Sequence, residues 1–418
     1  MDQDRNHAKN RARTGPKVLL TDTNRWPGPA RLAIGLAKAG CRVFGVCPRR
    51  GHPLLYARAV ERTFPYGSIR PLEALRAAIE TVNPQIVVPC DDRSVQHLHE
   101  LYVYAKSTGA SGDGLANLIE YSLGRPENFP ITTSRADLLR VATEEGIRVP
   151  RTKPLTSIDD LDSWENEPFP WVLKGDGTFG GRGVRIAENP LQAKKYFSDI
   201  TGLFGLSRAI KRAAVNRDPF WLRPWWENHR PAVIVQSHIK GRPANCAVFC
   251  WKGTIKAGIG VEVVNSDGQT GPASVVRLVD NPEMMFAAER IARRLGLSGC
   301  FGLDFMIEEG SGATYLIEMN PRSTPLSHLQ LGRGRDLVEA LAAELTNQPI
   351  MELPSVTQND LIAYFPQAWN SKNELWSSCF QDIPKDEPDL VSALMRPWPE
   401  RSLLFRLASK VSFLKSSA

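Results

Sequence analysis

The glycine-rich stretch WVLKGDGTFGGRGVRI, residues 171–186, has the residue types that hold phosphate groups. Lys174 ends a strand-like run and supplies a positive charge, and the glycines come directly after it. Glycine lets backbone N–H groups approach phosphate oxygens closely, because there is no Cβ in the way. Gly175, Gly177 and Gly180 also match the dinucleotide fingerprint G-x-G-x-x-G. The stretch therefore predicts a nucleotide-phosphate site, and the residues after Gly183 decide which kind of nucleotide it suits.

Those residues argue against two known phosphate loops. A dinucleotide loop opens a helix, but Val184 and Ile186 alternate as in a strand, and the next helix cannot begin before Asn189-Pro190. A Walker A loop ends in Lys-Ser/Thr, which GGRG lacks. We interpret the stretch as a hairpin of antiparallel strands that folds over phosphates, with Lys174 and Arg182 as its charges. A mobile hairpin with an incidental lysine remains the alternative.

A second group of polar residues lies in GLDFMIEEGSGATYLIEMNPR, about 130 residues further on. Glu318 and Asn320 are two apart on one strand of a predicted hairpin, so both point to one face, and Asp304 can join them from the other strand. Two carboxylates and a carboxamide suit Mg²⁺, which prefers oxygen ligands and keeps positions for substrate phosphates. Arg322 comes two residues later, placed to stabilise a transferring phosphoryl group or an oxyanion. The alternative is a pair of solvated or salt-bridged acids.

Alternating strand and helix patterns precede these motifs. Strand-like runs at 18–22, 41–48 and 85–92 alternate with helical runs at 29–40 and 72–82. This order predicts a parallel sheet with helices on both faces. The first strand–helix turn, TDTNRWPGPAR, lacks the glycine fingerprint, so a Rossmann-like domain here would not bind NAD at the usual place.

The pattern changes near residue 131. Helices are predicted at 134–146, 157–164, from Pro190, at 282–296 and at 335–346, and short alternating strands are predicted between 233 and 264. Residues 201–231 form a basic, Trp-rich insertion. We divide the chain into a disordered leader (1–15), a domain with a parallel sheet (16–130), a subdomain with the glycine hairpin (131–232), a subdomain with the metal site (233–346) and a C-terminal extension (347–418).

Taken in order, Lys174 with GTFGGRGV, VIVQSHIKGR, and GLDF…YLIEMNPR resemble the ATP-grasp superfamily, which includes carbamoyl phosphate synthetase, biotin carboxylase and D-alanine–D-alanine ligase. The resemblance covers residues 15–346. It implies an α/β Rossmann-like (pre-ATP-grasp) domain followed by an α+β ATP-grasp fold of two subdomains. It also implies ATP between the subdomains and Mg²⁺, with Mn²⁺ as an alternative, at the carboxylates.

The resemblance also assigns roles to single residues. Lys174 corresponds to the phosphate lysine and Arg322 to the catalytic arginine, while Lys256 is a weaker match to a second basic residue near the phosphates. The remaining assignments are Gly180, Gly181 and Gly183 to the flap; Gln236, Ser237 and Ile239 to the hinge at adenine; and Asp304, Glu318 and Asn320 to the metal. The sequence departs from the family at Arg135, where a lysine is common, and at Pro243, near the usual ribose-binding acid. His328 is expected to face the acceptor site, or to be a structural histidine.

Composition sets further limits. The chain has 52 Lys and Arg against 45 Asp and Glu, a net charge of +7, but no nucleic-acid motif accompanies the excess. Seven cysteines without C-x-x-C pairs indicate buried thiols in a reducing cytoplasm. We expect no membrane span and no nucleic-acid partner. The basic stretch SLLFRLASKVSFLK near the end predicts a docked helix, with a membrane-surface helix as the alternative.

These features together predict an ATP-dependent ligase that activates a carboxylate as an acylphosphate for attack by an amine or similar nucleophile. Its expected partners are a small carboxylate and an amine, and a homodimer is left open. Three alternatives remain: a regulatory or scaffold protein that binds ATP without turnover, an NAD oxidoreductase, and a biotin-type carboxylase. The substrate pocket is expected to use the CDDRS turn (90–94), the TDTNRW turn and residues after Arg322.

Overall fold

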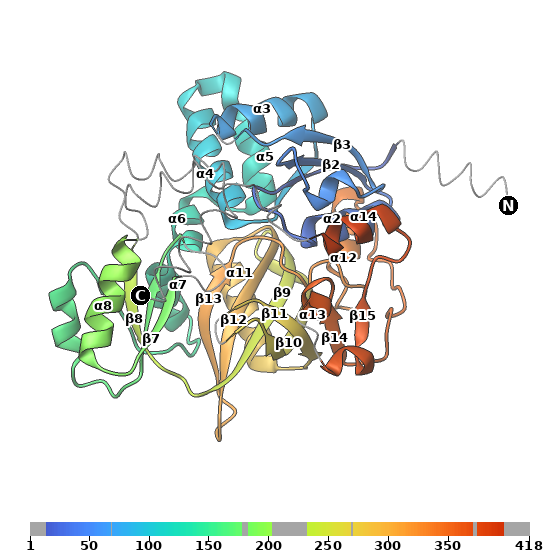
Figure 1. The fold of residues 1–418 in the computed structure, drawn as a ribbon. Coiled ribbons are helices and arrows are strands. Elements are labelled where there is room, and N and C mark those ends of the chain that lie inside the picture. Colours follow the sequence, from blue (N-terminus) through green and yellow to red (C-terminus); the bar gives the residue numbers. More distant parts are fainter. Residues whose placement is uncertain are drawn as a thin grey trace, which may run out of the picture.

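Four parallel strands form the N-terminal sheet of the computed structural model, which describes residues 14–67, 69–177, 183–202, 232–268, 271–370 and 374–396. The sheet has the order β3-β2-β1-β4. Strands β2 and β3 are labelled in Figure 1. Its strands are β1 (Lys17–Thr21), β2 (Arg42–Cys47), β3 (Val60–Pro65) and β4 (Ile86–Pro89). The predicted parallel sheet is confirmed.

Helices cover both faces of this sheet, which explains why the three central residues of β1, 18–20, are all apolar. Leu19 belongs to a core formed with α3, α4 and α5, whereas Val18 and Leu20 face a core that contains α2. These helices are α2 (Gly28–Lys38), α3 (Pro71–Val82), α4 (Asp92–Ser107) and α5 (Asp113–Leu123). Two further helices, α6 (Phe129–Thr133) and α7 (Arg135–Glu144), lead out of this part of the chain.

A seven-stranded sheet forms the centre of the molecule. Its order is β13-β12-β9-β10-β11-β14-β15, antiparallel except for the last pair. The strands are β9 (Gly241–Trp251), β10 (Thr254–Ser266), β11 (Ala273–Leu278), β12 (Gly299–Glu308), β13 (Thr314–Asn320), β14 (Leu361–Tyr364) and β15 (Phe380–Asp382). The helices associated with it are α11 (Pro282–Leu295), α12 (Leu337–Thr346), α13 (Gln367–Asn370) and α14 (Pro388–Met395).

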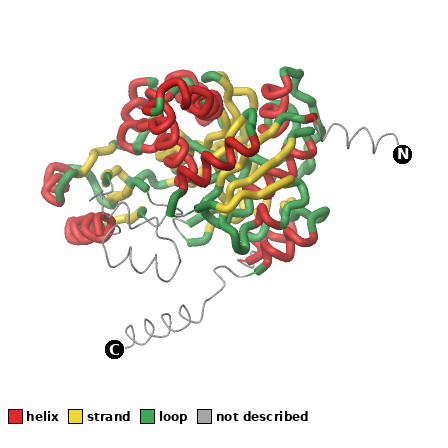
Figure 2. The backbone as a smooth tube through the Cα atoms, turned by 90° about the horizontal axis from the view of Figure 1, so that it is seen from above, coloured by secondary structure: helices red, strands yellow, loops and turns green. Residues whose placement is uncertain are grey.

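The third sheet is small and antiparallel, in the order β5-β8-β6-β7. It consists of β5 (Thr152–Leu155), β6 (Trp171–Gly175), β7 (Val184–Ala187) and β8 (Val233–Ser237). Helix α8 (Pro190–Thr201) starts after Asn189, whose side chain caps it. The strands on either side of the glycines are therefore antiparallel and no helix comes directly after the loop, as predicted. Figure 2 shows strands through the middle of the described chain and helices mostly outside them.

Two features differ from the sequence-based expectation. Residues 158–164 form a 3₁₀ helix instead of an α-helix, in which Asp160 accepts a hydrogen bond from the Ser157 N–H. The C-terminal extension also contributes to the central sheet, because β14 pairs with β11 and Ile362 is fully buried in the core shared with α2. The other 3₁₀ segments are Pro53–Leu55, Gly109–Gly112, Pro126–Asn128 and Glu374–Ser378.

Several expectations concern residues outside the described ranges. They include most of the leader, nearly all of the insertion, the tip of the glycine hairpin at 178–182, and the terminal stretch from residue 397. All seven cysteines are described, and each is a buried free thiol, as expected. No described helix has the length and apolar character needed to cross a bilayer.

Candidate functional site

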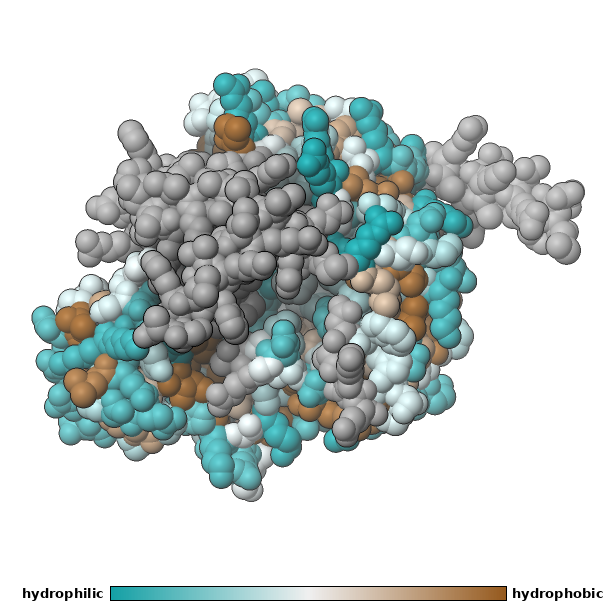
Figure 3. Space-filling model, viewed as in Figure 1, coloured by the Kyte–Doolittle hydropathy of each residue, from teal (hydrophilic) through white to brown (hydrophobic). Residues whose placement is uncertain are grey.

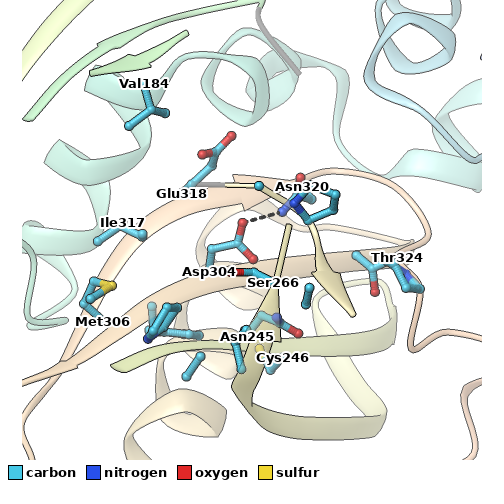
Figure 4. Close-up of a pocket in the computed structure, with 18 of the residues that line it drawn as sticks. Val184, Asn245, Cys246, Ser266, Asp304, Met306, Ile317, Glu318, Asn320 and Thr324 are labelled. Atoms are coloured by element: carbon cyan, nitrogen blue, oxygen red, sulfur yellow. Dashed lines mark hydrogen bonds between the residues drawn. The ribbon is translucent and has the colours of Figure 1, made fainter. Parts of the chain in front are cut away.

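Asp304 and Glu318 lie directly opposite each other on β12 and β13. The pairing then shifts, so that Phe305 pairs with Leu316 and Ile317 is an extra residue on β13. Such bulges re-aim side chains and are common beside active sites. Both carboxylates therefore reach one face of the hairpin, as predicted. Figure 4 shows Glu318, Asp304 and Asn320 grouped in the pocket.

Asn320 and Arg322 extend this group toward the N-terminal sheet. The Asn320 Nδ2 donates to Asp304 Oδ2 at 3.0 Å (Figure 4), and Arg322 Nη2 donates to Asn320 Oδ1 at 2.9 Å. Arg322 Nε donates to Asp92 Oδ1 at 3.1 Å, in the first turn of α4. The backbone N–H of Ser323 also donates to the Pro89 carbonyl at 3.1 Å. The β4–α4 junction therefore holds the predicted catalytic arginine in place.

Lys174 reaches the same group from β6. Its side chain is only 5% exposed, and its Nζ donates to the carbonyl of Ile317 at 3.4 Å. That carbonyl belongs to the extra residue of the bulge. Burial lowers the pKa of Lys174 to about 8, although Glu318 and Asp304 favour its charged form. The structure thus brings Lys174 to the carboxylates, as the sequence predicts.

Arg135 connects the glycine hairpin with the carboxylates. Its Nη1 donates to the Gly175 carbonyl at 3.0 Å and to Asp176 Oδ1 at 2.9 Å, and its Nη2 donates to Glu318 Oε1 at 2.5 Å. Charged side chains with little solvent contact are stable only when oppositely charged partners and hydrogen bonds offset the cost of burial, as they do here. Arg135 therefore takes the position at which the family commonly has a lysine, and it bonds directly to a predicted metal ligand.

The protonation behaviour of the two carboxylates fits a cation at this place. Burial and then the neighbouring Glu318 raise the pKa of Asp304 to about 6. Burial also raises the pKa of Glu318, but Arg135 and Lys174 outweigh it and hold this pKa below its usual value. A divalent cation between them would relieve their repulsion and use hard oxygen donors. No set of three His, Cys, Asp or Glu side chains is arranged to hold a metal among the described residues, so a cation here would rely on the Asn320 amide as well.

A cavity of about 670 Å³ runs past these residues. Its lining includes the predicted hinge residues Gln236, Ser237 and Ile239. Gln236 is buried, and its Nε2 donates to Thr152 Oγ1 at 3.0 Å across the β5–β8 pair. Pro243, which stands near the position where the family usually has a ribose-binding acid, also lines the cavity. The hinge, the lysine and the carboxylates therefore share one cavity large enough for a small-molecule ligand.

The far part of the cavity uses the turns that the sequence singled out. The cavity lining includes Asn24 and Asp92, from the turns after β1 and β4. The two turns are joined, because Asn24 Nδ2 donates to Asp91 Oδ2 at 2.7 Å. His328 also lines the cavity, and its Nε2 lies 2.8 Å from Asp382 Oδ2 on β15. The predicted position of His328 beside the cavity is therefore correct.

Lys256 is not brought to this site. Its Nζ forms an ion pair with Glu344 of α12 at 2.5 Å, and it is absent from the cavity lining. The prediction that Lys256 lies near the phosphates is wrong in its placement, because β10 turns this side chain toward α12. Gly180 and Gly181 lie outside the described residues, whereas the Gly183 carbonyl accepts from the Gly175 N–H at 3.1 Å.

Sequence reasoning missed several charged residues of the site. Asp92 is part of the CDDRS turn, which the sequence predicts only as part of the pocket wall. Its position directly after a buried parallel strand is the signal that could have marked it as a site residue, because ligands bind at the carboxyl ends of such strands. Asp176 lies within the glycine stretch, where the sequence assigns roles only to the lysine, the arginine and the glycines. Asp382 and Arg31 gave no signal, because each needs a partner that is far away in the chain.

Comparison with known proteins agrees with this geometry. Residues 136–325 match the family model of the ATP-grasp domain. This part of the chain is therefore an ATP-grasp domain.

Individual relatives are distant. A carbamoyl-phosphate synthase of Methanobrevibacter smithii is 24% identical over 205 residues, which is 48% of this chain and 48% of that protein. The chain thus spans about half the length of that curated relative. The biotin carboxylase domain of 2-oxoglutarate carboxylase from Hydrogenobacter thermophilus superposes with a TM-score of 0.57 at 15% identity, covering 81% of this chain and 71% of that one.

An N5-carboxyaminoimidazole synthetase from Staphylococcus aureus, solved with ADP, gives a TM-score of 0.55 at 14% identity. The match covers 82% of this chain and 79% of that one. At these identities the solved structures show a common fold, which includes the mixed α/β architecture described above.

Proposed function

We propose that the protein is an ATP-dependent ligase that activates a carboxylate as an acylphosphate, which an amine or a similar nucleophile then attacks. The observation that carries this proposal is the meeting of Lys174, from the glycine hairpin, with Asp304, Glu318 and Asn320 in one cavity. A phosphate-binding lysine and an oxygen-rich cation site are the parts that phosphoryl transfer requires. The described relatives include ligases of this superfamily.

Each residue has a distinct role in this scheme. Gln236, Ser237 and Ile239 hold the base at the hinge, and Lys174 neutralises charge on the phosphates. Asp304, Glu318 and Asn320 would hold Mg²⁺, which would supply positive charge against the phosphates. These assignments rest on the cavity lining and on the contacts described above.

Arg322 stabilises charge at the reacting centre. Asp92 and Asn320 each accept a hydrogen bond from its guanidinium, so that it is preorganised and does not have to be ordered during the reaction. The substrate carboxylate attacks the γ-phosphoryl group, the bond to the β-phosphate oxygen breaks, and ADP leaves. The nucleophile then displaces phosphate from the acylphosphate. Positioning and charge stabilisation supply most of the rate.

The proposal is tested by ADP release in the presence of a panel of small carboxylates and amines. We expect release to require one member of each class. Glu318→Gln and Lys174→Ala should each lower turnover by about a thousandfold, because each removes charge that is needed in the transition state. Asp113→Asn, on the surface of α5, is a control that should retain activity. Full activity in either site variant would refute the assignment.

A nucleotide-binding protein without turnover is the second candidate. The Arg135–Glu318 ion pair favours it, because an arginine already occupies one oxygen of a predicted metal ligand. In that case the protein would bind Mg·ATP and release no ADP with any substrate pair. Failure of the whole panel, together with tight ATP binding, would select this candidate.

A further inference from the structure

The cavity continues well beyond the carboxylates. Glu318 is on β13 and Asp382 is on β15, and these strands are the two opposite edges of the seven-stranded sheet. Neighbouring strands lie about 4.8 Å apart, so the two ends of the cavity are far from each other. Asp382 and its neighbours also lie outside the matched family region, 136–325. This end of the cavity is therefore built by segments that the family match does not cover.

Three charged or polar side chains meet at this end. Asp382 Oδ1 pairs with Arg31 Nη2, and Asp382 Oδ2 lies 2.8 Å from His328 Nε2. Burial would raise the pKa of Asp382, but His328 and Arg31 outweigh it and keep the carboxylate ionised. Both of its oxygens are therefore in use, and Asp382 is not available to bind a cationic ligand.

Arg31 retains binding capacity. Its Nε contacts His328 Nε2 at 3.4 Å and its Nη2 is held by Asp382. No described residue accepts a hydrogen bond from its Nη1, and the side chain remains 12% exposed at the cavity. A guanidinium whose orientation is fixed by a buried carboxylate is well suited to bind a second carboxylate.

The surrounding wall is apolar and aromatic. Trp26, just before α2, and Pro29, in its first turn, line one side of it, and Tyr364 and Phe365, at and just after the end of β14, line another. Tyr364 is also the strand partner of Asp382, so the aromatic wall and the ion pair belong to one piece of sheet. Such a wall favours a ligand with an apolar body over a bare ion.

We propose that this end of the cavity is the subsite for the non-nucleotide substrate, which carries an apolar body and a carboxylate that Arg31 holds. This inference rests on the proposed function, which assigns the other end of the cavity to the nucleotide. Because Arg31 lies away from Lys174 and Glu318, the carboxylate that it binds is not phosphorylated and is retained in the product. The substrate is therefore an amino-acid-like or dicarboxylate molecule and not a simple monoacid.

The test measures binding and needs no turnover. The full chain, saturated with Mg²⁺ and a non-hydrolysable ATP analogue, is titrated calorimetrically with phenylacetate, phenylacetamide, benzylammonium and acetate. We expect phenylacetate to bind about tenfold or more tightly than its amide, since a hydrogen bond to a charged group is lost in the amide. Phenylacetate should also bind more tightly than acetate, which lacks the apolar body.

Variants assign this preference to Arg31. Arg31→Gln should remove the difference between acid and amide, and the double variant Arg31→Gln/Asp382→Asn should do the same without leaving a buried charge unpaired. Arg58→Gln is the matched control. It breaks the exposed ion pair of Arg58 with Asp389, which also joins the N-terminal part to the C-terminal extension.

The outcomes separate this inference from the proposed function. A preference for acid that is lost with Arg31 and kept in Arg58→Gln supports the subsite, whether or not ADP is ever released. Equal binding of acid and amide, tighter binding of benzylammonium, a preference that survives in the double variant, or no binding of any probe would overturn it. Failure of the proposed function would instead appear as absent ADP release with the carboxylate and amine panel.

Discussion

Lys174 lies in the cavity wall with its side chain almost completely buried. Burial lowers its pKa to about 8, so that its charge is lost just above neutral pH. An ordinary exposed lysine keeps its charge to about pH 10. The phosphate binding that we propose for this residue should therefore be sensitive to pH in a range where that of exposed lysines is not.

This difference leads to a pH prediction. Below pH 8 Lys174 is protonated before ligand arrives, and affinity for ADP should not depend on its titration. Above pH 8 a proton must be taken up on binding, so affinity should fall by up to tenfold per pH unit. Titration calorimetry in buffers from pH 7 to about pH 9.5 measures this. In Lys174→Arg the decline should disappear, because arginine stays charged, and an unchanged decline in that variant would contradict the role of Lys174.

The polar residues show which parts of a site a sequence reveals. Glu318, Asn320 and Arg322 were found because a spacing of two puts side chains on one face of a strand. Asp304 was found because a hairpin was evident around GSG. The Arg31–Asp382 pair was not predictable, because it depends on how β15 packs against α2 and on no local pattern.

At the level of elements, the junction of β4 and α4 controls the position of the chain directly after β13. Asp92 holds Arg322 through its side chain, and Pro89 holds Ser323 through the backbone. The N-terminal sheet thus contributes to the geometry of the site, although it lies outside the matched family region.

Asp92→Ala is expected to lower kcat about tenfold with little change in the KM for ATP. The reason is that Arg322 loses the acceptor for its Nε and is less well placed at the reacting centre. Steady-state ADP release measures both parameters. Asp92→Asn, which keeps an oxygen acceptor, should recover part of the loss. Wild-type kcat in Asp92→Ala would show that Asn320 alone is sufficient to position the arginine.

Gly241 illustrates a constraint on strand β9. A Cβ at this position would lie 2.0 Å from the carbonyl oxygen of Ile307 on β12. We expect Gly241→Ala to lower the free energy of unfolding by about 1–3 kcal/mol, the usual cost of overpacking. Chemical denaturation measures the change.

Gly114→Ala is the matched control for this substitution. Nothing lies within 4 Å of a Cβ at this position in α5, so alanine should leave stability unchanged or raise it by about 0.5–1 kcal/mol. Equal effects of the two substitutions would show that the approach of β9 to β12 is not the cause.

Most elements could be predicted from periodicity, but their pairing could not. The helices at 282–295 and 337–346 and the hairpin at 299–320 appeared because their apolar patterns are regular. Strands β14 and β15 are three to four residues long and have no alternation to detect. The bulge at Ile317 could not be predicted either, because it depends on the pairing register of β12 and β13 and not on composition.

At the scale of the whole molecule, one apolar core joins the N-terminal sheet, the central sheet and the C-terminal extension. Val18, Phe249, Leu341, Ile362 and Leu390 all belong to it. In contrast, Figure 3 shows that hydrophobic residues on the described part of the visible surface occur in small groups among hydrophilic ones. The N-terminal sheet, the central sheet and the C-terminal extension therefore share one hydrophobic core and are not independently folded domains.

Truncation tests this view. A chain that ends at residue 346 lacks β14, β15 and α14 and exposes one side of β11, so it should lose cooperative thermal unfolding or aggregate. A chain that ends at residue 396 keeps every contact described above and should unfold cooperatively. Differential scanning calorimetry compares them. A sharp transition in the shorter chain would show that the extension is a separate unit.

The bulge at Ile317 also limits how this gene can change in length. Deleting one residue of β12 between Asp304 and the turn would shift Asp304 out of register with Glu318, because only β13 carries an extra residue there. The turn at 309–313 carries no such restriction, since residues added there leave the pairing of Asp304 with Glu318 intact. Insertions and deletions that natural selection retains in this hairpin should therefore fall at its tip, and the two strands should vary by substitution alone.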